Sequence, residues 1–309
     1  MARACGKIIL LGEHAVVYGF PAIAAGIERG AEARAWPSTA SRLVVGDHAA
    51  RPDDPSELGR AYRALLEVLG VRDVAVEVSL ELPPGCGLGA SATVAVATAR
   101  AVLGATRRSE HDQARVLAAA QAWEGVFHGN PSGIDATTAA LGGCLRFVRG
   151  RGAEPLLVGQ ALAIAVAIAG PPASTRAMVE AVARLREIRP AHVEDVFRGI
   201  ARLVERAREL LASGTLDLVG QLMNKNQEFL TELGVSTPAI DEACADARRA
   251  GALGAKLTGS GGGGAIIALV EPPVEPVLSA WKARGLECFV TVVSAPSAPL
   301  PLAQPAARA

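Results

Sequence analysis

Three glycines alternate in the segment Pro83–Thr93, which reads Pro-Pro-Gly-Cys-Gly-Leu-Gly-Ala-Ser-Ala-Thr. An apolar, alternating stretch typical of a strand precedes the segment, and an alanine-rich stretch typical of a helix follows it. Glycine allows positive φ and close approach of a ligand. A helix N-terminus offers unpaired N–H groups and the positive end of the helix dipole. The pattern therefore predicts an anion site that favours phosphate, with a ligand-free turn as the open alternative.

This loop differs from two common phosphate-binding loops. No Lys-Ser or Lys-Thr pair follows the glycines, as a Walker A loop requires, and the third glycine comes one residue too early for the dinucleotide fingerprint. Ser91 lies at the start of the predicted helix. Its hydroxyl would either cap the helix or ligate Mg²⁺, and the residue pattern alone favours the cap.

Three other features suggest chemistry or close packing. Asp135 follows Asn-Pro-Ser-Gly, a context that usually gives a turn or an N-cap residue, but its carboxylate could also serve as a base. Lys7 lies inside an apolar segment, where a buried ammonium needs a partner. Gly259 and Gly261–Gly264 predict a close approach between backbone segments, or alternatively a bulged hairpin.

Hydrophobic periodicity predicts the elements that would position these residues. Expected strands cover 6–11, 21–36 (as one or two strands), 42–45, 74–80, 143–148, 162–168, 254–258, 265–270 and 287–293. Expected helices cover 58–69, 90–103, 109–127, a short segment after Pro131, 175–187, 192–211, 215–233, 238–250 and 274–284. This interleaving indicates an α+β protein with an N-terminal domain at 1–165 and a C-terminal domain at 166–293. The Pro- and Ala-rich tail, 294–309, is predicted to be disordered.

Composition excludes several classes of function. Half of the 309 residues are hydrophobic, but no apolar run approaches the roughly 20 residues of a membrane helix, and no secretory signal is evident. The formal net charge is zero, which argues against nucleic acid as a partner. Five scattered cysteines lack metal-ligand spacing, which argues against zinc or iron. We expect a cytoplasmic protein with neither a membrane nor a nucleic-acid partner.

Three separated segments resemble the three signature motifs of the GHMP kinases, small-molecule kinases named for galactose, homoserine, mevalonate and phosphomevalonate, and a fourth similar segment lies between them. The segments are Gly6–Gly19, Pro83–Thr93, Glu124–Asp135 and Lys256–Gly264, and they follow the family's order. The first, which contains Gly-Glu-His-Ala-Val-Val-Tyr-Gly, and the His-Gly-Asn-Pro-Ser-Gly-Ile-Asp block are most similar to members that phosphorylate mevalonate.

The resemblance implies a fold and an activity. The N-terminal domain should resemble the second domain of ribosomal protein S5, and the C-terminal domain should be ferredoxin-like, with the active site in the cleft between them. The implied reaction is transfer of the γ-phosphate of ATP to the 5-hydroxyl of mevalonate, giving 5-phosphomevalonate and ADP. Phosphomevalonate or another acceptor of the family, a serine hydrolase built on Ser91, and a non-enzymatic nucleotide sensor are the alternatives. A homodimer is one option for the assembly.

The resemblance also assigns roles to single residues. Asp135 matches the aspartate that accepts the hydroxyl proton, and Lys7 matches its partner. Ser91 and Glu124 match the ligands of Mg²⁺. The substrate site would contain Glu13, His14, Asp135 and Thr175. The ATP phosphates would contact Pro84, Gly85, Cys86, Gly87, Leu88, Gly89, Ala90, Ser91 and Gly261.

Two positions depart from the family pattern. Ala90 replaces the first serine of the usual Gly-Leu-Gly-Ser-Ser loop, which removes one hydroxyl near the phosphates. Ala173 replaces an arginine that often precedes the matching threonine, Thr175, by two positions. The contacts to substrate on that side of the cleft are therefore left open.

Overall fold

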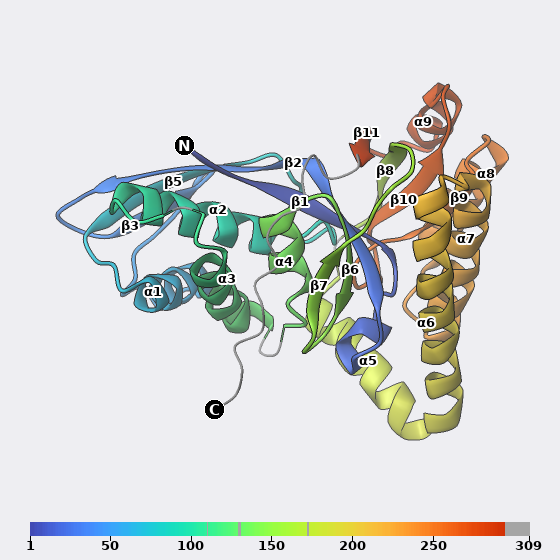
Figure 1. Cartoon of the computed structure of the whole chain (residues 1–309), viewed down its shortest axis with the longest axis horizontal. Helices are drawn as coiled ribbons and strands as arrows, with labels where there is room; N and C mark the ends of the chain where they lie inside the picture. Colours follow the sequence, from blue (N-terminus) through green and yellow to red (C-terminus); the bar gives the residue numbers. More distant parts are fainter. Residues whose placement is uncertain (110, 129–130, 172, 294–309) are drawn as a thin grey trace.

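The computed structural model describes residues 1–109, 111–128, 131–171 and 173–293. In this part of the chain the elements form two sheets, each covered by helices, and the two units lie side by side (Figure 1). The predicted disordered tail, 294–309, lies outside the described residues. No helix in the described ranges combines the length and the apolar character needed to cross a bilayer.

The first sheet has seven strands within the described residues, in the order β4-β3-β5-β2-β6-β7, with β1 also paired to β2. All pairs are antiparallel except β3 with β5. The strands are β1 (Ala2–Leu11), β2 (Ala22–Pro37), β3 (Arg42–Val45), β4 (His48–Ala50), β5 (Val74–Leu80), β6 (Cys144–Val148) and β7 (Gly152–Pro155). A short 3₁₀ helix, η1 (Ala15–Tyr18), follows β1.

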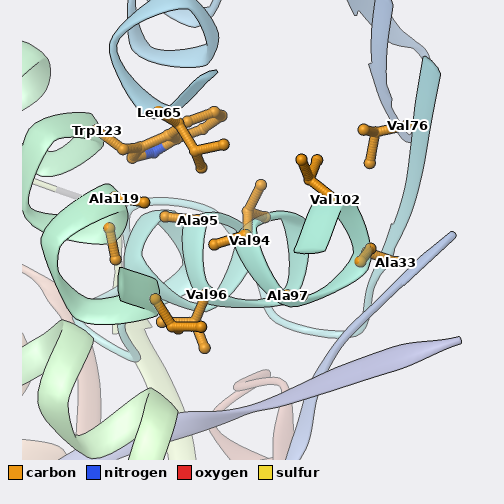
Figure 2. Packing of buried hydrophobic residues seen from close by; sticks show 14 of the residues in the cluster. Ala33, Leu65, Val76, Val94, Ala95, Val96, Ala97, Val102, Ala119 and Trp123 are labelled. Carbon is orange, nitrogen blue, oxygen red and sulfur yellow. The ribbon is translucent and has the colours of Figure 1, made fainter. Parts of the chain in front are cut away.

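Four helices cover one face of this sheet: α1 (Glu57–Leu69), α2 (Ala90–Ala105), α3 (Gln113–His128) and α4 (Ile134–Leu141). Helix α2 is buried on nearly all sides because its alanines and valines allow the sheet and the neighbouring helices to approach closely. Figure 2 shows Val94 and Val102 of α2 near Leu65 of α1 and Val76 of β5. This packing holds the N-terminus of α2 in a fixed place, and with it the glycine-rich segment Pro83–Gly89 that precedes the helix.

The second sheet runs β11-β8-β10-β9, with every pair antiparallel. Its strands are β8 (Leu162–Gly170), β9 (Gly254–Leu257), β10 (Gly264–Val270) and β11 (Cys288–Val293). Its helices are α5 (Thr175–Ile188), α6 (Pro190–Ser213), α7 (Leu216–Glu232), α8 (Pro238–Arg249) and α9 (Glu275–Ala283). Numbered along the chain, the strand order is 4-1-3-2, which is the expected ferredoxin-like arrangement with additional helices before the second strand.

The two sheets share a hydrophobic core. Ile8 and Leu10 of β1 belong to the same buried cluster as Ile164 of β8 and Ile267 of β10. Large apolar contacts of this kind favour a fixed relation between two domains. The cleft between the domains therefore has walls that are held in place from both sides.

Several boundaries differ from the sequence prediction. Segment 21–36 forms the single strand β2, and β4, β7 and η1 were not predicted. Helix α3 begins four residues later than 109 because the Asp112 side chain caps it, accepting the N–H of Arg115 at 3.1 Å. The predicted domain boundary at 165/166 falls inside β8, all of which pairs within the second sheet.

Candidate active site

The loop Pro83–Gly89, termed the phosphate loop after its predicted ligand, has the positive φ angles that its alternating glycines suggested. Gly85, Gly87 and Gly89 all have positive φ, between 75° and 84°, and α2 begins directly after Gly89. Other residues rarely adopt this conformation, so the glycines let the chain turn three times before the helix. Gly89 itself occupies the N-cap position, so Ser91 lies inside the first turn and is not the cap. The first N–H groups of α2 thus lie at the cleft, where an anion would be stabilised.

The second glycine-rich segment packs against this loop. A Cβ on Gly87 would lie 2.6 Å from the carbonyl oxygen of Thr258, and a Cβ on Gly259 would lie 2.8 Å from the Cα of Gly87. The N–H of Ala265 donates to the carbonyl of Cys86 at 2.8 Å. Side chains at these glycines would push the two domains apart. The glycines therefore serve close packing between the domains, as predicted, rather than an isolated hairpin.

Most of the predicted phosphate contacts lie on this loop, with differing exposure. Pro84 and Gly85 are exposed, Cys86 and Leu88 are buried, and Ala90 is half-buried. Gly261 packs within the second domain: a Cβ there would be 2.2 Å from the carbonyl oxygen of Val235, in the loop before α8. Its predicted contact with phosphate stays a prediction.

Lys7 and Asp135 form the ion pair that the resemblance implied. Lys7 Nζ lies 3.0 Å from Asp135 Oδ1, and the side chains are 3% and 36% exposed, respectively. The N–H of Lys7 donates to the carbonyl of Leu88 at 2.9 Å, which ties β1 to the phosphate loop. Asp135 is the second residue of α4, whose N-cap is Gly133, so it is not the cap. A buried cation and a partly exposed carboxylate thus meet beside the phosphate loop.

Ser91 and Glu124 also meet. Ser91 Oγ donates to Glu124 Oε1 at 2.5 Å and accepts from Trp123 Nε1 at 3.1 Å. The pKa of Glu124 is raised to about 7, mainly by burial; the hydrogen bond from Ser91 lowers it, and the charge of Asp135 adds to the rise. His128 Nε2 lies 3.5 Å from Glu124 Oε2. In the described ranges the hydrogen bonds of the Ser91 hydroxyl are to Glu124 and Trp123, not to a histidine.

These oxygens fit Mg²⁺. Magnesium prefers hard oxygen ligands and is usually held by one or two carboxylates together with substrate phosphates. A hydroxyl and a carboxylate 2.5 Å apart at the N-terminus of α2 supply such oxygens next to the phosphate loop. A carboxylate that burial keeps partly protonated is also one that a nearby cation would ionise.

Glu13 and His14 follow β1 and lie at the domain interface. His14 Nε2 donates to the carbonyl of Ser260 at 2.9 Å, and burial lowers the pKa of His14, so the ring is neutral with Nδ1 as an acceptor. The Glu13 side chain is fully buried and accepts hydrogen bonds from Lys256 and Asn226. Burial raises the pKa of Glu13, and the charge of Lys256 opposes the rise.

Thr175 begins α5, after the capping residue Ser174. Its Oγ1 lies 3.4 Å from Ser260 Oγ, and both residues belong to the second domain. A cavity of about 100 Å³ brings the predicted substrate and catalytic residues together, lined in part by Lys7, Glu13, His14, Asp135 and Thr175. A second cavity, of about 560 Å³, shares Asp135 and Thr175 with it.

Sequence reasoning missed three cations in this region. Arg149 and Arg176 line the larger cavity, together with Glu124 and Asp135. Lys256 is fully buried in β9. The argument that singled out Lys7, an ammonium inside an apolar strand, applies equally to Lys256 and would have found it. Nothing local marks the two arginines among the many others of the chain.

Comparison with known proteins defines the class. Residues 57–143 match the family model described as the GHMP kinases N terminal domain, and residues 207–286 match the model described as GHMP kinases C terminal. The chain belongs to the GHMP kinase family.

Individual relatives narrow the class of kinase further. The chain is 36% identical to the mevalonate kinase of Pyrococcus horikoshii over 325 residues, covering 95% of each chain. It is 36% identical to that of Thermococcus gammatolerans over 326 residues, covering 95% of this chain and 96% of the relative. The crystal structure of L. major mevalonate kinase in complex with R-mevalonate superposes with a TM-score of 0.85 at 31% identity, covering 96% of both chains.

Proposed function

We propose that the protein transfers the γ-phosphate of ATP to the 5-hydroxyl of mevalonate, giving 5-phosphomevalonate and ADP. The observation that carries this proposal is the Lys7–Asp135 pair, which lies where the two cavities meet beside the phosphate loop. The relatives named mevalonate kinase cover nearly the whole chain, and one related structure holds R-mevalonate. These likenesses favour mevalonate over the other acceptors of the family.

The proposed step uses Asp135 as the acceptor of the hydroxyl proton. The hydroxyl oxygen forms a bond to the γ-phosphorus, the bond from that phosphorus to the bridging oxygen breaks, and ADP leaves with the electron pair. Lys7 pairs with this carboxylate and stabilises negative charge on the attacking oxygen and the transferred group. The N–H groups at the start of α2 and the phosphate loop bind the phosphates.

Ser91 and Glu124 would hold Mg²⁺, which, when bound, supplies positive charge to the β- and γ-phosphates. Arg149 and Arg176 line the larger cavity with guanidinium groups, which suit the carboxylate of mevalonate. His14 and Thr175 offer an acceptor and a hydroxyl at the smaller cavity. Cytoplasmic location and a homodimer stay predictions of the sequence.

The experiment is a coupled assay of ADP release with mevalonate, phosphomevalonate, galactose and homoserine offered in turn. We expect turnover above the ATP-only background with mevalonate, and we expect excess EDTA to abolish it. Faster turnover with phosphomevalonate would overturn the choice of acceptor. Unchanged turnover in excess chelator would overturn the metal site.

The raised pKa of Glu124 predicts a pH-dependent affinity for the metal. A metal binds the ionised carboxylate, so below pH 7 it must displace a proton from Glu124. At pH 6 only about one tenth of a group with pKa 7 is ionised, so the apparent Mg²⁺ affinity should be about tenfold weaker than its plateau above pH 8. Titration of the MgATP complex by the fluorescence of Trp123, which donates to Ser91, would measure this.

Glu124→Gln is the control for this prediction, because it lacks the titrating group but keeps the shape of the side chain. The variant should bind MgATP weakly, with only the pH dependence of ATP itself. If wild type and variant showed the same pH profile, Glu124 would not be a ligand of the metal.

A further inference from the structure

A fully buried ion pair joins the two domains beneath the cleft. Lys256 Nζ, on β9, donates to Oε1 of Glu13, which follows β1, across 243 residues of chain, and both side chains are 0% exposed. Asn226 Nδ2, on α7, donates to Glu13 Oε2 at 3.2 Å. Both carboxylate oxygens of Glu13 are therefore already bound by protein groups.

The strand that carries Lys256 is held on both sides. Strand β9 pairs with β10 on one side, and α7 covers the other (Figure 1). There the N–H of Ala255 donates to Asn224 Oδ1 at 3.0 Å, and the N–H of Leu257 donates to Gln227 Oε1 at 2.9 Å. Side-chain amides of α7 thus replace a further strand at this sheet edge.

The backbone of β1 is tied to the same place. The N–H of Ile9 donates to Thr258 Oγ1 at 2.8 Å, and Lys256 Nζ also reaches the carbonyl of Ile9 at 3.5 Å. Directly after Thr258 comes the glycine-rich segment that packs on the phosphate loop. The position of Lys256 therefore affects both β1 and the glycine-rich segment, which lie on opposite sides of the cleft.

Glu13 immediately precedes a strained turn. His14 has φ 61° and ψ −50°, and the N–H of Ala15 donates to the carbonyl of Glu13 at 2.7 Å, which makes a γ-turn with positive φ around His14. Such a conformation persists only when its surroundings hold it in place. Here Lys256 and Asn226 hold the residue before His14, and the carbonyl of Ser260 holds its ring.

We propose that Lys256 is a positioning residue that, through Glu13, holds His14 and the Thr258–Gly264 segment at the acceptor cavity, and that Glu13 does not itself touch the acceptor. The acceptor cavity is the smaller of the two described above, lined in part by Lys7, His14 and Asp135, so the proposal rests on the proposed function. A buried ion pair is often no more stabilising than apolar side chains of the same size, so stability alone does not account for it. The strained turn next to Glu13 suggests another role for the ion pair, which is to hold His14 in its unfavourable conformation.

The test compares Lys256→Met, Glu13→Gln and the double variant that combines them, which leaves no buried charge unpaired. Arg284→Met, which breaks ion pairs with Glu242 and Asp246 at the surface of the same domain, is the matched control. For each variant, KM for mevalonate, KM for ATP, kcat and the melting temperature are measured. Should a single variant fail to fold, the double variant still gives the decisive comparison.

Positioning predicts that the double variant regains melting temperature while its KM for mevalonate stays raised by about tenfold, close to that of either single variant, because the two residues act as one unit. If the double variant recovered both the wild-type melting temperature and the wild-type KM, the Lys256–Glu13 pair would only stabilise the fold. A raised KM in Glu13→Gln with an unchanged KM in Lys256→Met would mean that Glu13 contacts the acceptor directly.

Hydrogen exchange separates this proposal from the choice of acceptor, because it needs no substrate. The double variant should exchange amides faster in two distant segments, 12–18 and 257–264, and the Arg284→Met control should not. Unchanged exchange in both segments would overturn the positioning role, whichever acceptor the enzyme uses. If the double variant exchanged faster but the wild-type protein did not turn over mevalonate, the positioning role of Lys256 would stand. Only the choice of mevalonate as the acceptor would be refuted.

Discussion

Asp135→Asn is expected to lower kcat by about 10²- to 10⁴-fold, or roughly 3–5 kcal/mol of transition-state stabilisation. The amide keeps the shape of the side chain but neither accepts the hydroxyl proton nor pairs as an anion with Lys7, 3.0 Å away. The coupled ADP assay with mevalonate measures kcat. ATP should still bind, because the phosphate loop and the Ser91–Glu124 pair are unchanged.

Asp195→Asn is the matched control, since Asp195 lies on α6 with its side chain 78% exposed. It should leave kcat unchanged. If Asp135→Asn also kept wild-type kcat, Asp135 would be only a residue in the first turn of α4. Trp123 fluorescence would show in the same samples whether ATP binding had been lost instead.

Lys7→Met should lower kcat by a similar factor, because the charge that stabilises the attacking oxygen and the transferred phosphate is removed. The variant should fold, since the methionine fills the apolar surroundings of Lys7 and the Asp135 carboxylate, 36% exposed, remains accessible to water. The double variant with Asp135→Asn should lose less activity than the product of the two single losses, because each residue tunes the other.

Lys225→Met is the control for this cycle, because Lys225 forms an exposed ion pair with Glu228 on α7. Losses that multiplied in the double variant would show that Lys7 and Asp135 act independently. A melting curve beside each kinetic measurement separates lost activity from lost folded protein.

Local sequence patterns were enough to predict most helices and strands. The segment Val74–Leu80 alternates and forms β5 with those limits, and Pro238 marks the start of α8. The short strands β4 and β7 escaped because three or four residues carry too little periodicity. The start of α3 was placed too early because Ser109 and Asp112 are both plausible caps, and only Asp112 is used.

For the site, sequence could indicate residue types but not their partners. The odd position of Lys7 in an apolar strand was visible, and the resemblance supplied Asp135 as its partner. The engagement of Glu13 by Lys256 was not visible, because it depends on the packing of two domains. Gly87 and Gly259 likewise showed that some close approach was needed, but not that they approach each other.

The hydrogen bond between Ile9 and Thr258 spans 249 residues, so it can form only after the ribosome has made most of the chain. N-terminal domains generally fold first as the chain emerges. A nascent chain that ends before β9 already contains Lys7, Glu124, Asp135 and Thr175, but it lacks Lys256 and the glycine-rich segment that packs on the phosphate loop. The cluster around Ile8 and Leu10 would also lack the members that β10 and β11 contribute, such as Ile267 and Phe289. We therefore expect activity to appear only after Gly264 has left the exit tunnel, and chaperones to bind the shorter chains.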